Sequence, residues 1–436
     1  MGYDIIIGRD SSDKKDFSNR GLINIGKGFV KMGQYTSLSN KIFMDIARSH
    51  VILVAGKRGS GKSYTLGVIA EELSNLPKEA SQNIASLIFD TMGIYWTMKF
   101  KNEKDSALLE EWGLETKKLP VKVFVPIGHW ENYLDKKIPV DEKFALDPSE
   151  MNADDWIMIF DLKIIEPVAV LIQRIIHKLK QEKKFTIEKI ISEIKKDLES
   201  LHETKNSAVS LFEVAQTWGI FAKENQPATT IRELVNAGTT SVLDLSVYNS
   251  VGAFNIRGLV INLISRKIFN QRMDSRKEEE MKSISQKISY SNQEEKKKDP
   301  LVWIFIDEAH EFLPLGEKTI ATDALIQLLR EGRQPGISVV LATQQPGKIH
   351  TDVMTQSDIV ISHRVTSSQD LNALNNIMQS YVLESIKKQM DDLPSLKGSA
   401  ILLDDNSERI YPMRVRPRFT WHGGEAPTSI SKEKSL

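Results

Sequence analysis

Residues 56–63 read Gly56-Lys57-Arg58-Gly59-Ser60-Gly61-Lys62-Ser63 and match the phosphate-binding pattern Gly-x-x-x-x-Gly-Lys-[Ser/Thr] at every fixed position. The apolar segment 51–55 before them is typical of a buried parallel strand. The segment 63–73 after them carries apolar residues at helical spacing. Glycines between a strand and a helix let backbone N–H groups surround phosphate oxygens. We therefore predict binding of a nucleoside triphosphate; the alternative is an ordinary glycine-rich turn between a strand and a helix.

The same pattern gives individual side chains a role. Lys62 is expected to reach the β- and γ-phosphates, and the Ser63 hydroxyl is expected to hold Mg²⁺. ATP and Mg²⁺ are therefore the predicted ligands. The residues predicted to bind the nucleotide are Gly56, Lys57, Arg58, Gly59, Ser60, Gly61, Lys62, Ser63 and Tyr64.

A second decisive segment, 301–306, is wholly apolar and ends in the adjacent acids Asp307 and Glu308. We predict that Asp307 supports the Mg²⁺ shell and that Glu308 polarises the water that attacks the γ-phosphate. Two acids at the end of a strand can also serve only as solubilising charges. The phosphate-binding pattern upstream favours the catalytic role.

Two more strand ends are expected at the same edge of the sheet. The apolar segment 84–90 ends in Asp90, which is predicted to orient Mg²⁺-bound or attacking water. The alternative for Asp90 is to cap the turn that follows it. The segment 337–346 ends in an amide pair, of which Gln344 is predicted to sense the γ-phosphate.

Arg330 and Arg333 lie between these acids and this strand, at the end of a predicted helix. Either guanidinium is a candidate for stabilising the charge of the transition state. Because Gly332 breaks the helix, Arg333 is expected to project from a loop, as a candidate to act in its own chain or across a subunit boundary. Arg330 is expected to pair with a nearby acid, and a surface ion pair is the alternative for both arginines.

Composition limits the class of protein. The chain has 436 residues, 41% of them hydrophobic and 27% charged, which is typical of a globular protein with ample core. It contains no cysteine and no apolar run of the ~20 residues that a membrane span needs. Lysine plus arginine equal aspartate plus glutamate at 58 each, so any contact with nucleic acid must be local. We expect a cytoplasmic protein without a membrane partner.

The predicted fold class is α/β: a RecA-like P-loop NTPase with a central, mostly parallel sheet, a helical insertion and a short N-terminal β segment. The segment 277–299 is highly charged and is expected to be a mobile surface loop or a frayed helix. The predicted parts are a truncated, barrel-like β segment at 1–45, the ATPase core at 46–128 and 235–424, a mainly helical insertion at 129–234, and a flexible tail at 425–436.

Several segments together resemble the HerA family of ring ATPases, relatives of the FtsK DNA pumps. The resemblance implies a homohexamer with ATP sites between subunits, which moves double-stranded DNA through its centre. It also implies a partner nuclease, of the NurA type or another effector. The matching segments are His50-Val51 before the phosphate loop, Phe89-Asp90 with Gly93 and Tyr95, 244–246, 307–312, 330–333, 342–346, and 416–418 with 421–424.

Three departures from the family pattern bear on function. Ile94 stands where members often have an acid, and Gln345 stands where they often have arginine. The N-terminal part, residues 1–49, is short for the complete β-barrel that docks a nuclease, which leaves the partner open. The predicted function is a double-stranded DNA translocase or helicase in DNA end processing or defence. The alternative is a nucleotide-dependent ring scaffold that regulates an effector; a nucleotide kinase would need a lid and an acceptor site.

Overall fold

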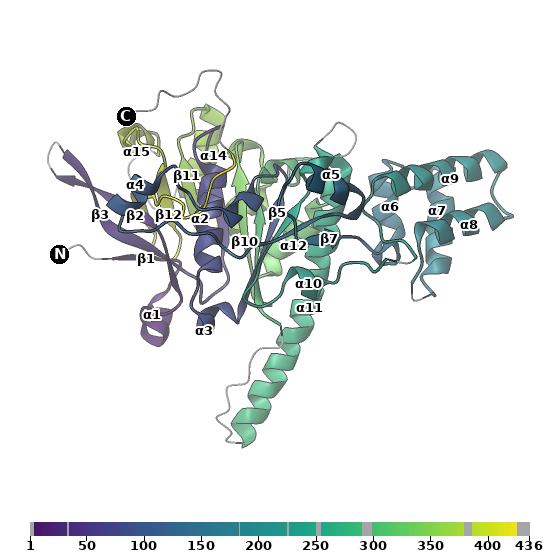
Figure 1. Ribbon diagram of the computed structural model, residues 1–436, viewed down its shortest axis with the longest axis horizontal. Coiled ribbons are helices and arrows are strands. Elements are labelled where there is room, and N and C mark those ends of the chain that lie inside the picture. Colours follow the sequence, from purple (N-terminus) through teal and green to yellow (C-terminus); the bar gives the residue numbers. More distant parts are fainter. Residues whose placement is uncertain are drawn as a thin grey trace.

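A computed structural model gives the fold, shown in Figure 1. It describes residues 4–32, 35–182, 184–224, 226–249, 254–289, 299–378 and 386–424. The tail 425–436, predicted to be flexible, lies outside the described residues. No helix in the described part of the chain is both long enough and apolar enough to span a bilayer.

The strands of the described residues form one sheet of thirteen strands, in the order β1-β3-β2-β13-β12-β11-β4-β10-β9-β5-β8-β6-β7. From β11 to β7 neighbouring strands are parallel, and from β11 to β3 they are antiparallel. The strands are Ile5–Ile7 (β1), Leu22–Met32 (β2), Tyr35–Asp45 (β3), Val51–Ala55 (β4), Ile84–Asp90 (β5), Lys122–Pro126 (β6), Glu142–Phe144 (β7), Thr240–Asp244 (β8), Leu301–Ile306 (β9), Ile337–Thr343 (β10), Ile359–His363 (β11), Ser399–Asp404 (β12) and Arg409–Val415 (β13).

The strand before the phosphate loop, β4, is buried on both faces, as its continuous apolar sequence predicts. Side chains alternate between the two faces of a strand, so Val51 and Leu53 join one hydrophobic cluster while Ile52 and Val54 join the other. The two clusters are the two layers of core that cover the sheet.

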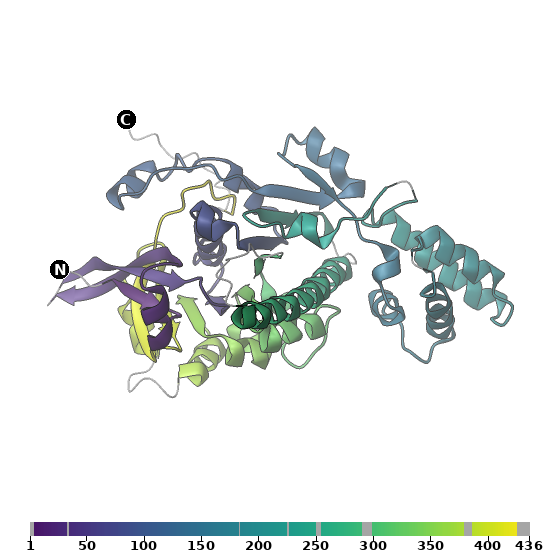
Figure 2. The same cartoon turned by 90° about the horizontal axis from the view of Figure 1, so that it is seen from below.

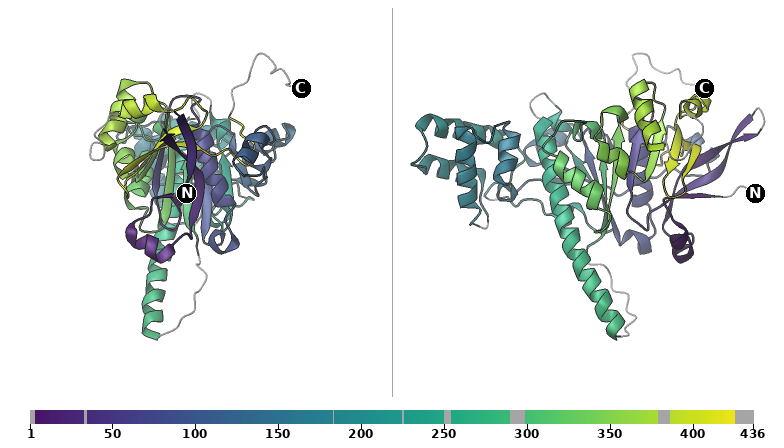
Figure 3. Two further views of the ribbon diagram at one scale, coloured as in Figure 1. Left: turned by 90° about the vertical axis from the view of Figure 1, so that its left-hand side faces the viewer. Right: turned by 180° about the vertical axis from the view of Figure 1, so that it is seen from behind.

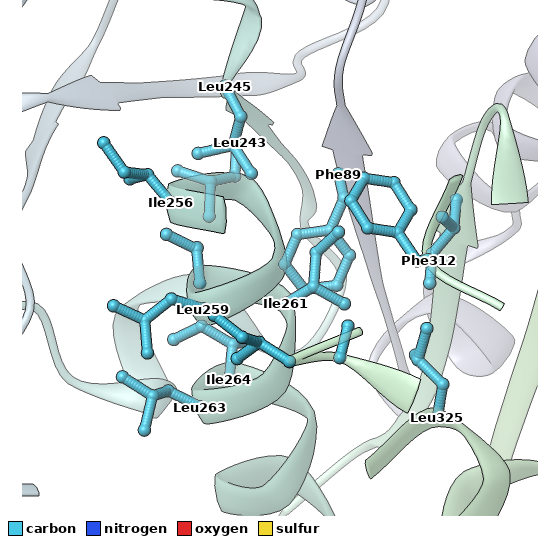
Figure 4. Packing of buried hydrophobic residues seen from close by; sticks show 14 of the residues in the cluster. Phe89, Leu243, Leu245, Ile256, Leu259, Ile261, Leu263, Ile264, Phe312 and Leu325 are labelled. Carbon is cyan, nitrogen blue, oxygen red and sulfur yellow. The ribbon is translucent and has the colours of Figure 1, made fainter. Parts of the chain in front are cut away.

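Helices cover both faces of the sheet (Figure 2). The helix after the phosphate loop, α2, contributes Leu66 and Ile69 to the cluster on one face. Helices α11 and α12 cover the other face, where α11 places Leu259, Ile261 and Ile264 beside Phe89 of β5 (Figure 4). The helices are Ser11–Phe17 (α1), Lys62–Ser74 (α2), Lys78–Ser81 (α3), Ser106–Glu111 (α4), Trp130–Asp135 (α5), Ala153–Ile159 (α6), Pro167–Leu179 (α7), Ile187–Lys196 (α8), His202–Thr217 (α9), Ile231–Leu234 (α10), Phe254–Ser289 (α11), Thr322–Glu331 (α12), Thr351–Gln356 (α13), Ser368–Met378 (α14) and Ile386–Asp392 (α15).

The N-terminal strands continue the main sheet. Strand β2 pairs with β3 on one side and with β13 on the other, where Met413 lies opposite Gly28. The hairpin of β2 and β3 therefore forms one end of the molecule, opposite the helices of residues 153–217 (Figure 3).

Helices α6 to α9 form a small bundle that stands away from the sheet (Figure 1). Its interior is aromatic: Trp156 of α6 lies 4.8 Å from Phe212 of α9 and 5.4 Å from Phe221, centroid to centroid. The segment 129–234 also supplies β7, which pairs with β6 at the end of the main sheet. Three residues without an alternating pattern gave no signal for this strand.

Helix α11 is much longer than the apolar pattern predicts. Its first part is buried against the sheet, and its last turns project from the body of the molecule (Figure 3). The helix continues to Ser289, so of the two alternatives for the charged segment 277–299, a loop or a frayed helix, its described part is helical. The remainder of that segment, 290–298, lies outside the described residues.

Candidate nucleotide-binding site

The sheet order brings the predicted site residues to one edge. Strand β10 lies between β4 and β9, and all three are parallel. The phosphate loop after β4, Gln344 after β10 and the acids after β9 therefore meet at the carboxyl ends of neighbouring strands. In open α/β sheets this is the edge where ligands bind.

The backbone of the phosphate loop needs its glycines. Gly61 caps α2 with a left-handed φ of 112°. At Gly56 a Cβ atom would lie 2.4 Å from Ser60 Oγ and 2.7 Å from His363 Cβ, so only glycine fits there. This geometry agrees with a loop whose N–H groups close around phosphate oxygens. Lys57, Arg58 and Gly59, at the outer part of the loop, are exposed.

His363, at the end of β11, packs against the phosphate loop at Gly56 and contacts Thr65 of α2. Its Nδ1 donates to the Ser399 carbonyl over 3.1 Å, which leaves Nε2 to accept from the Thr65 hydroxyl at 2.8 Å. Burial lowers the pKa of His363 to about 4, so the ring is neutral at physiological pH. Sequence reasoning gave neither His363 nor Thr65 a role, because the two are 298 residues apart.

Lys62 and Ser63 begin α2 at the loop. The Lys62 ammonium is nearly buried and donates to the Lys57 carbonyl over 3.2 Å. Burial lowers the pKa of Lys62, and the negative charges of Glu308 and Asp307 oppose that shift. Lys62 is therefore close enough to both predicted acids to feel their charges. A lysine that binds the terminal phosphate next to these acids is expected to lie there.

The acid pair has two different environments. The Asp307 carboxylate accepts from the Glu308 N–H at 2.9 Å and lies 3.3 Å from the Tyr95 hydroxyl. Glu308 has a left-handed φ of 52°. Its Oε1 accepts a hydrogen bond from the Gln344 amide, and within the described residues its buried Oε2 has no hydrogen-bond partner.

Those contacts leave Glu308 able to take up a proton. Burial raises its pKa, and the neighbouring Asp307 charge raises it further. A carboxylate with a raised pKa and an oxygen that accepts no hydrogen bond from the described residues has the properties of a general base. His310 lies nearby, with Nδ1 3.4 Å from the Thr343 hydroxyl and 3.6 Å from Glu308 Oε2.

Asp90 caps the turn that follows it, which is the alternative role that the sequence left open. One carboxylate oxygen accepts from the N–H groups of Met92 and Gly93, at 3.2 and 2.7 Å, and the other accepts from that of Tyr95 at 2.8 Å. Both oxygens are therefore occupied by the turn, and the predicted role in orienting water has no support in this geometry. Burial and the neighbouring Asp244 raise the pKa of Asp90 to about 8.

The turn that Asp90 fixes carries a residue that the prediction did not use. The Tyr95 hydroxyl lies 3.3 Å from both Asp307 Oδ2 and the Ser63 carbonyl. It thus contacts the side chain of one predicted Mg²⁺ ligand, Asp307, and the backbone of the other, Ser63. The side chain is 1% exposed. Its place in the family motif was the available signal, but the motif alone did not indicate what the hydroxyl contacts.

Tyr64 is tied to the C-terminal segment, although it was predicted to bind nucleotide. Its hydroxyl accepts the Arg418 N–H at 2.7 Å, and its ring lies edge-on to His422 at 5.2 Å. Burial raises the pKa of Tyr64 to about 12. The hydroxyl is therefore used in anchoring α2.

Arg333 lies at the amino ends of the parallel strands, opposite the carboxyl ends where the phosphate loop lies. It precedes β10, whereas Gln344 follows it, and the seven residues of the strand span roughly 20 Å. Arg333 is in a turn after α12, as predicted, where it pairs with Asp358 at 3.3 Å. Arg330 pairs with Asp352 at 2.7 Å. The structure therefore does not bring Arg333 to the phosphate loop of its own chain.

The residues that converge fit ATP and Mg²⁺. The glycine loop and Lys62 form a cradle for phosphate, and the Ser63 hydroxyl and Asp307 carboxylate are the oxygen ligands that Mg²⁺ prefers. Among the described residues there is no cluster of three or more histidine, aspartate or glutamate side chains that would hold a metal alone. A Mg²⁺ ion here would take its remaining ligands from phosphate and water.

Known proteins share parts of this sequence. Over 186 residues the chain is 26% identical to the "DNA double-strand break repair helicase HerA" of Pyrococcus furiosus, covering 39% of this chain and 31% of that protein. Over 103 residues it is 29% identical to the "Probable DNA double-strand break repair helicase HerA" of Methanocaldococcus jannaschii, covering 23% and 20%. The aligned parts are thus under a third of the relatives' lengths.

A solved structure shares the fold. VirB4 of Thermoanaerobacter pseudethanolicus has a TM-score of 0.53 at 10% identity, over 95% of this chain and 97% of that one. This likeness and the observed sheet confirm the predicted fold class, a RecA-like P-loop NTPase with a mostly parallel sheet.

Two family models match the chain. The model of the zonular occludens toxin (Zot) matches residues 241–370. The model described as "Helicase HerA, central domain" matches residues 30–268, which is more than half of the chain and includes the phosphate loop. The protein therefore belongs to the HerA helicase family.

Proposed function

We propose that the protein hydrolyses ATP and uses the energy to move along double-stranded DNA, as a homohexameric motor of the HerA type. The observation that carries this proposal is the convergence of Lys62, Gln344 and Glu308 at one edge of the sheet, next to a glycine loop suited to phosphate. The names of the archaeal relatives, both helicases of DNA repair, support the DNA part of the proposal.

In this mechanism the chain's own groups divide the work. Backbone N–H groups of the loop hold the phosphates, and Lys62 balances the charge on the terminal one. Glu308 accepts a proton from the attacking water through Oε2, the oxygen that accepts no hydrogen bond from the described residues. Bound Mg²⁺, held by Ser63 and Asp307, would neutralise charge on the β- and γ-phosphates. The Gln344 amide, bonded to Glu308, would report loss of the γ-phosphate.

Two substitutions test hydrolysis. Glu308→Gln should keep ATP binding but lower turnover by about 100-fold or more, because general-base assistance is worth that much. Lys62→Ala should also weaken binding. Steady-state turnover and titration of a fluorescent ATP analogue measure the two effects separately. A Glu308→Gln protein that turns over ATP at the wild-type rate would show that another group is the base.

DNA dependence separates the two functions considered. A motor on double-stranded DNA should turn over ATP faster with linear duplex present, while a ring scaffold for an effector protein should not respond. The measurement is ATP turnover with increasing duplex, with single-stranded DNA of equal length as the control, followed by displacement of a protein block from the duplex. Turnover that duplex leaves unchanged, with no displacement, would favour the scaffold.

We further propose work in the cytoplasm with a partner nuclease, of the NurA type or another effector. The resemblance to the HerA family is the support for this partner.

A further inference from the structure

Arg333 is one end of a line of alternating charges. Its guanidinium lies 3.3 Å from Asp358 Oδ1, and Asp358 Oδ2 lies 2.6 Å from His50 Nδ1. The other ring nitrogen, His50 Nε2, lies 3.3 Å from Asp45 Oδ2. Asp45 Oδ1 accepts from Arg9 Nε at 2.8 Å. Five charged side chains from five different segments are thus in direct contact.

Four of these groups are buried and the fifth is at the surface. The side chains of Arg9, Asp45 and His50 are 0%, 1% and 2% exposed, that of Asp358 is 8% exposed, and that of Arg333 is 51% exposed. Buried charges are tolerated only when each is paired. Burial alone would lower the pKa of His50, but its hydrogen bonds to Asp358 and Asp45 outweigh burial and raise the pKa to about 9. The histidine is therefore a cation between two carboxylates.

The chain of ion pairs runs from the N-terminal hairpin to Arg333 at the amino ends of the parallel strands. Asp45 is the last residue of β3, His50 directly precedes β4, and Asp358 directly precedes β11. At the far end, Arg9 also donates to the carbonyls of Ser18 and Arg20, in the turn that leads into β2. A displacement of the hairpin would therefore reach Arg333 through His50.

Arg333 and His50 compete for the same carboxylate. His50 holds Asp358 Oδ2, and the Val51 N–H holds Oδ1 at 2.8 Å, so the contact left for Arg333 is long. Arg333 also donates to the Gln356 carbonyl, again over 3.3 Å. Without His50, Asp358 Oδ2 would be released and could accept a second hydrogen bond from Arg333 beside the contact at Oδ1, which is the two-oxygen geometry that guanidinium and carboxylate prefer.

We propose that His50 is a positioning residue that keeps Arg333 available to the ATP site of the neighbouring subunit and links it to the N-terminal hairpin; this rests on the proposed function. His50 engages Asp358, which weakens the hold of Asp358 on Arg333. The exposed guanidinium then reaches across the subunit boundary. A shift of Asp45 with the hairpin changes that balance, so a partner that binds the hairpin would set the rate of ATP hydrolysis.

Kinetics give the first test. His50→Ala should lower kcat about tenfold, within the range of typical coupling energies, and leave KM for ATP within about twofold. The double variant His50→Ala/Arg333→Ala should be no slower than Arg333→Ala. The matched control is Asp404→Asn, which removes the carboxylate that accepts the Gly8 N–H at 3.0 Å, near the same hairpin but outside the charge line. This control should keep the wild-type kcat.

Subunit mixing gives the sharper test. Inactive Lys62→Ala and Arg333→Ala subunits, once shown to exchange between rings, should recover activity, because Lys62→Ala subunits supply Arg333 to neighbours with an intact Lys62. His50→Ala added to the Lys62→Ala subunit should lower the recovered activity about tenfold, as it lowers kcat. His50→Ala added to the Arg333→Ala subunit should leave it unchanged.

The outcomes separate the two proposals. Equal effects in both placements would overturn the inference, because His50 would then act through general stability or its own site. No recovery from the parent mixture, or a wild-type kcat for Arg333→Ala, would also overturn it, because Arg333 would not act in trans. Either result would leave ATP hydrolysis standing if Glu308→Gln is inactive.

Discussion

Tyr95 contacts both sides of the candidate site, and its hydroxyl can be removed without changing the shape of the ring. Tyr95→Phe should lower kcat about fivefold, equivalent to one modest hydrogen bond of about 1 kcal/mol. It should also raise the Mg²⁺ concentration needed for half-maximal turnover, because Asp307 loses a group that orients it. Turnover at increasing Mg²⁺ measures both effects.

A suitable control is Tyr248→Phe. The Tyr248 hydroxyl is also buried and donates to the Trp218 carbonyl at 2.8 Å, away from the phosphate loop. Tyr248→Phe should keep the wild-type Mg²⁺ dependence. If the two variants behave alike, the contact between Tyr95 and Asp307 has no part in turnover.

The predicted site residues that lie close together share one property: each stands at the carboxyl end of a parallel strand. Asp307 and Gln344 directly follow β9 and β10, and Lys62 follows the glycine loop after β4, so the parallel strands bring these positions together. The contacts that were not predicted join distant segments without a motif, as Thr65 and His363 do. For Asp90 the sequence left two roles open, and burial under its own turn selected capping.

Helix α2 is fastened to the C-terminal segment by a buried ionic network. Glu71 is fully buried and accepts from Arg416 at 3.1 Å and from Arg418 at 3.0 Å. Burial alone would raise the pKa of Glu71, but the two guanidinium charges hold it below its usual value. Because α2 begins at the phosphate loop, this network fixes the element that carries Lys62.

Gly67 makes room for that network. An added Cβ would lie 2.4 Å from Arg418 Nη1 and 2.5 Å from its Cζ, and Glu71 prevents the guanidinium from moving away. Gly67→Ala should therefore lower Tm, although alanine favours a helix by about 1 kcal/mol relative to glycine. The control is Gly258→Ala in α11, where the nearest atom is at 3.7 Å. Gly258→Ala should keep or raise Tm; a rise in both would show that Arg418 can move aside.

At the level of elements, strong patterns predicted the parallel strands, and weak ones were missed. Strand β13 contains Pro412, and a proline usually argues against a strand inside a sheet. Strand β12 pairs with residues 409–414 of β13, whereas β2 pairs with Met413, Arg414 and Val415 after the proline, a register that only the tertiary structure supplies. For the charged part of α11 the sequence left a loop and a frayed helix open, because that part has no apolar face to indicate a helix.

For the whole molecule, the placement of Arg333 bears on assembly. The arginine and the phosphate loop lie at opposite edges of one sheet, so a complete site with Arg333 requires a second chain. Light scattering with a non-hydrolysable ATP analogue should report six copies of the 49.3 kDa chain. Lys62→Ala, which binds nucleotide weakly, should assemble less. A strict monomer with full ATP turnover would remove the site between subunits.

The pairing of β2 with β13 also implies a delay during synthesis on the ribosome, between the time when β2 is made and the time when its partner strand is made. Residue 32 ends β2, and β13 does not begin until residue 409. At about 5–20 residues per second, the hairpin waits roughly 20–80 s for its partner strand. During that time β2 presents an unpaired edge, the kind of surface on which nascent chains aggregate. Slower translation or loss of chaperones should therefore reduce the soluble yield. Because β13 is made after the strands that carry the ATP site, the hairpin can join the sheet after that site has formed.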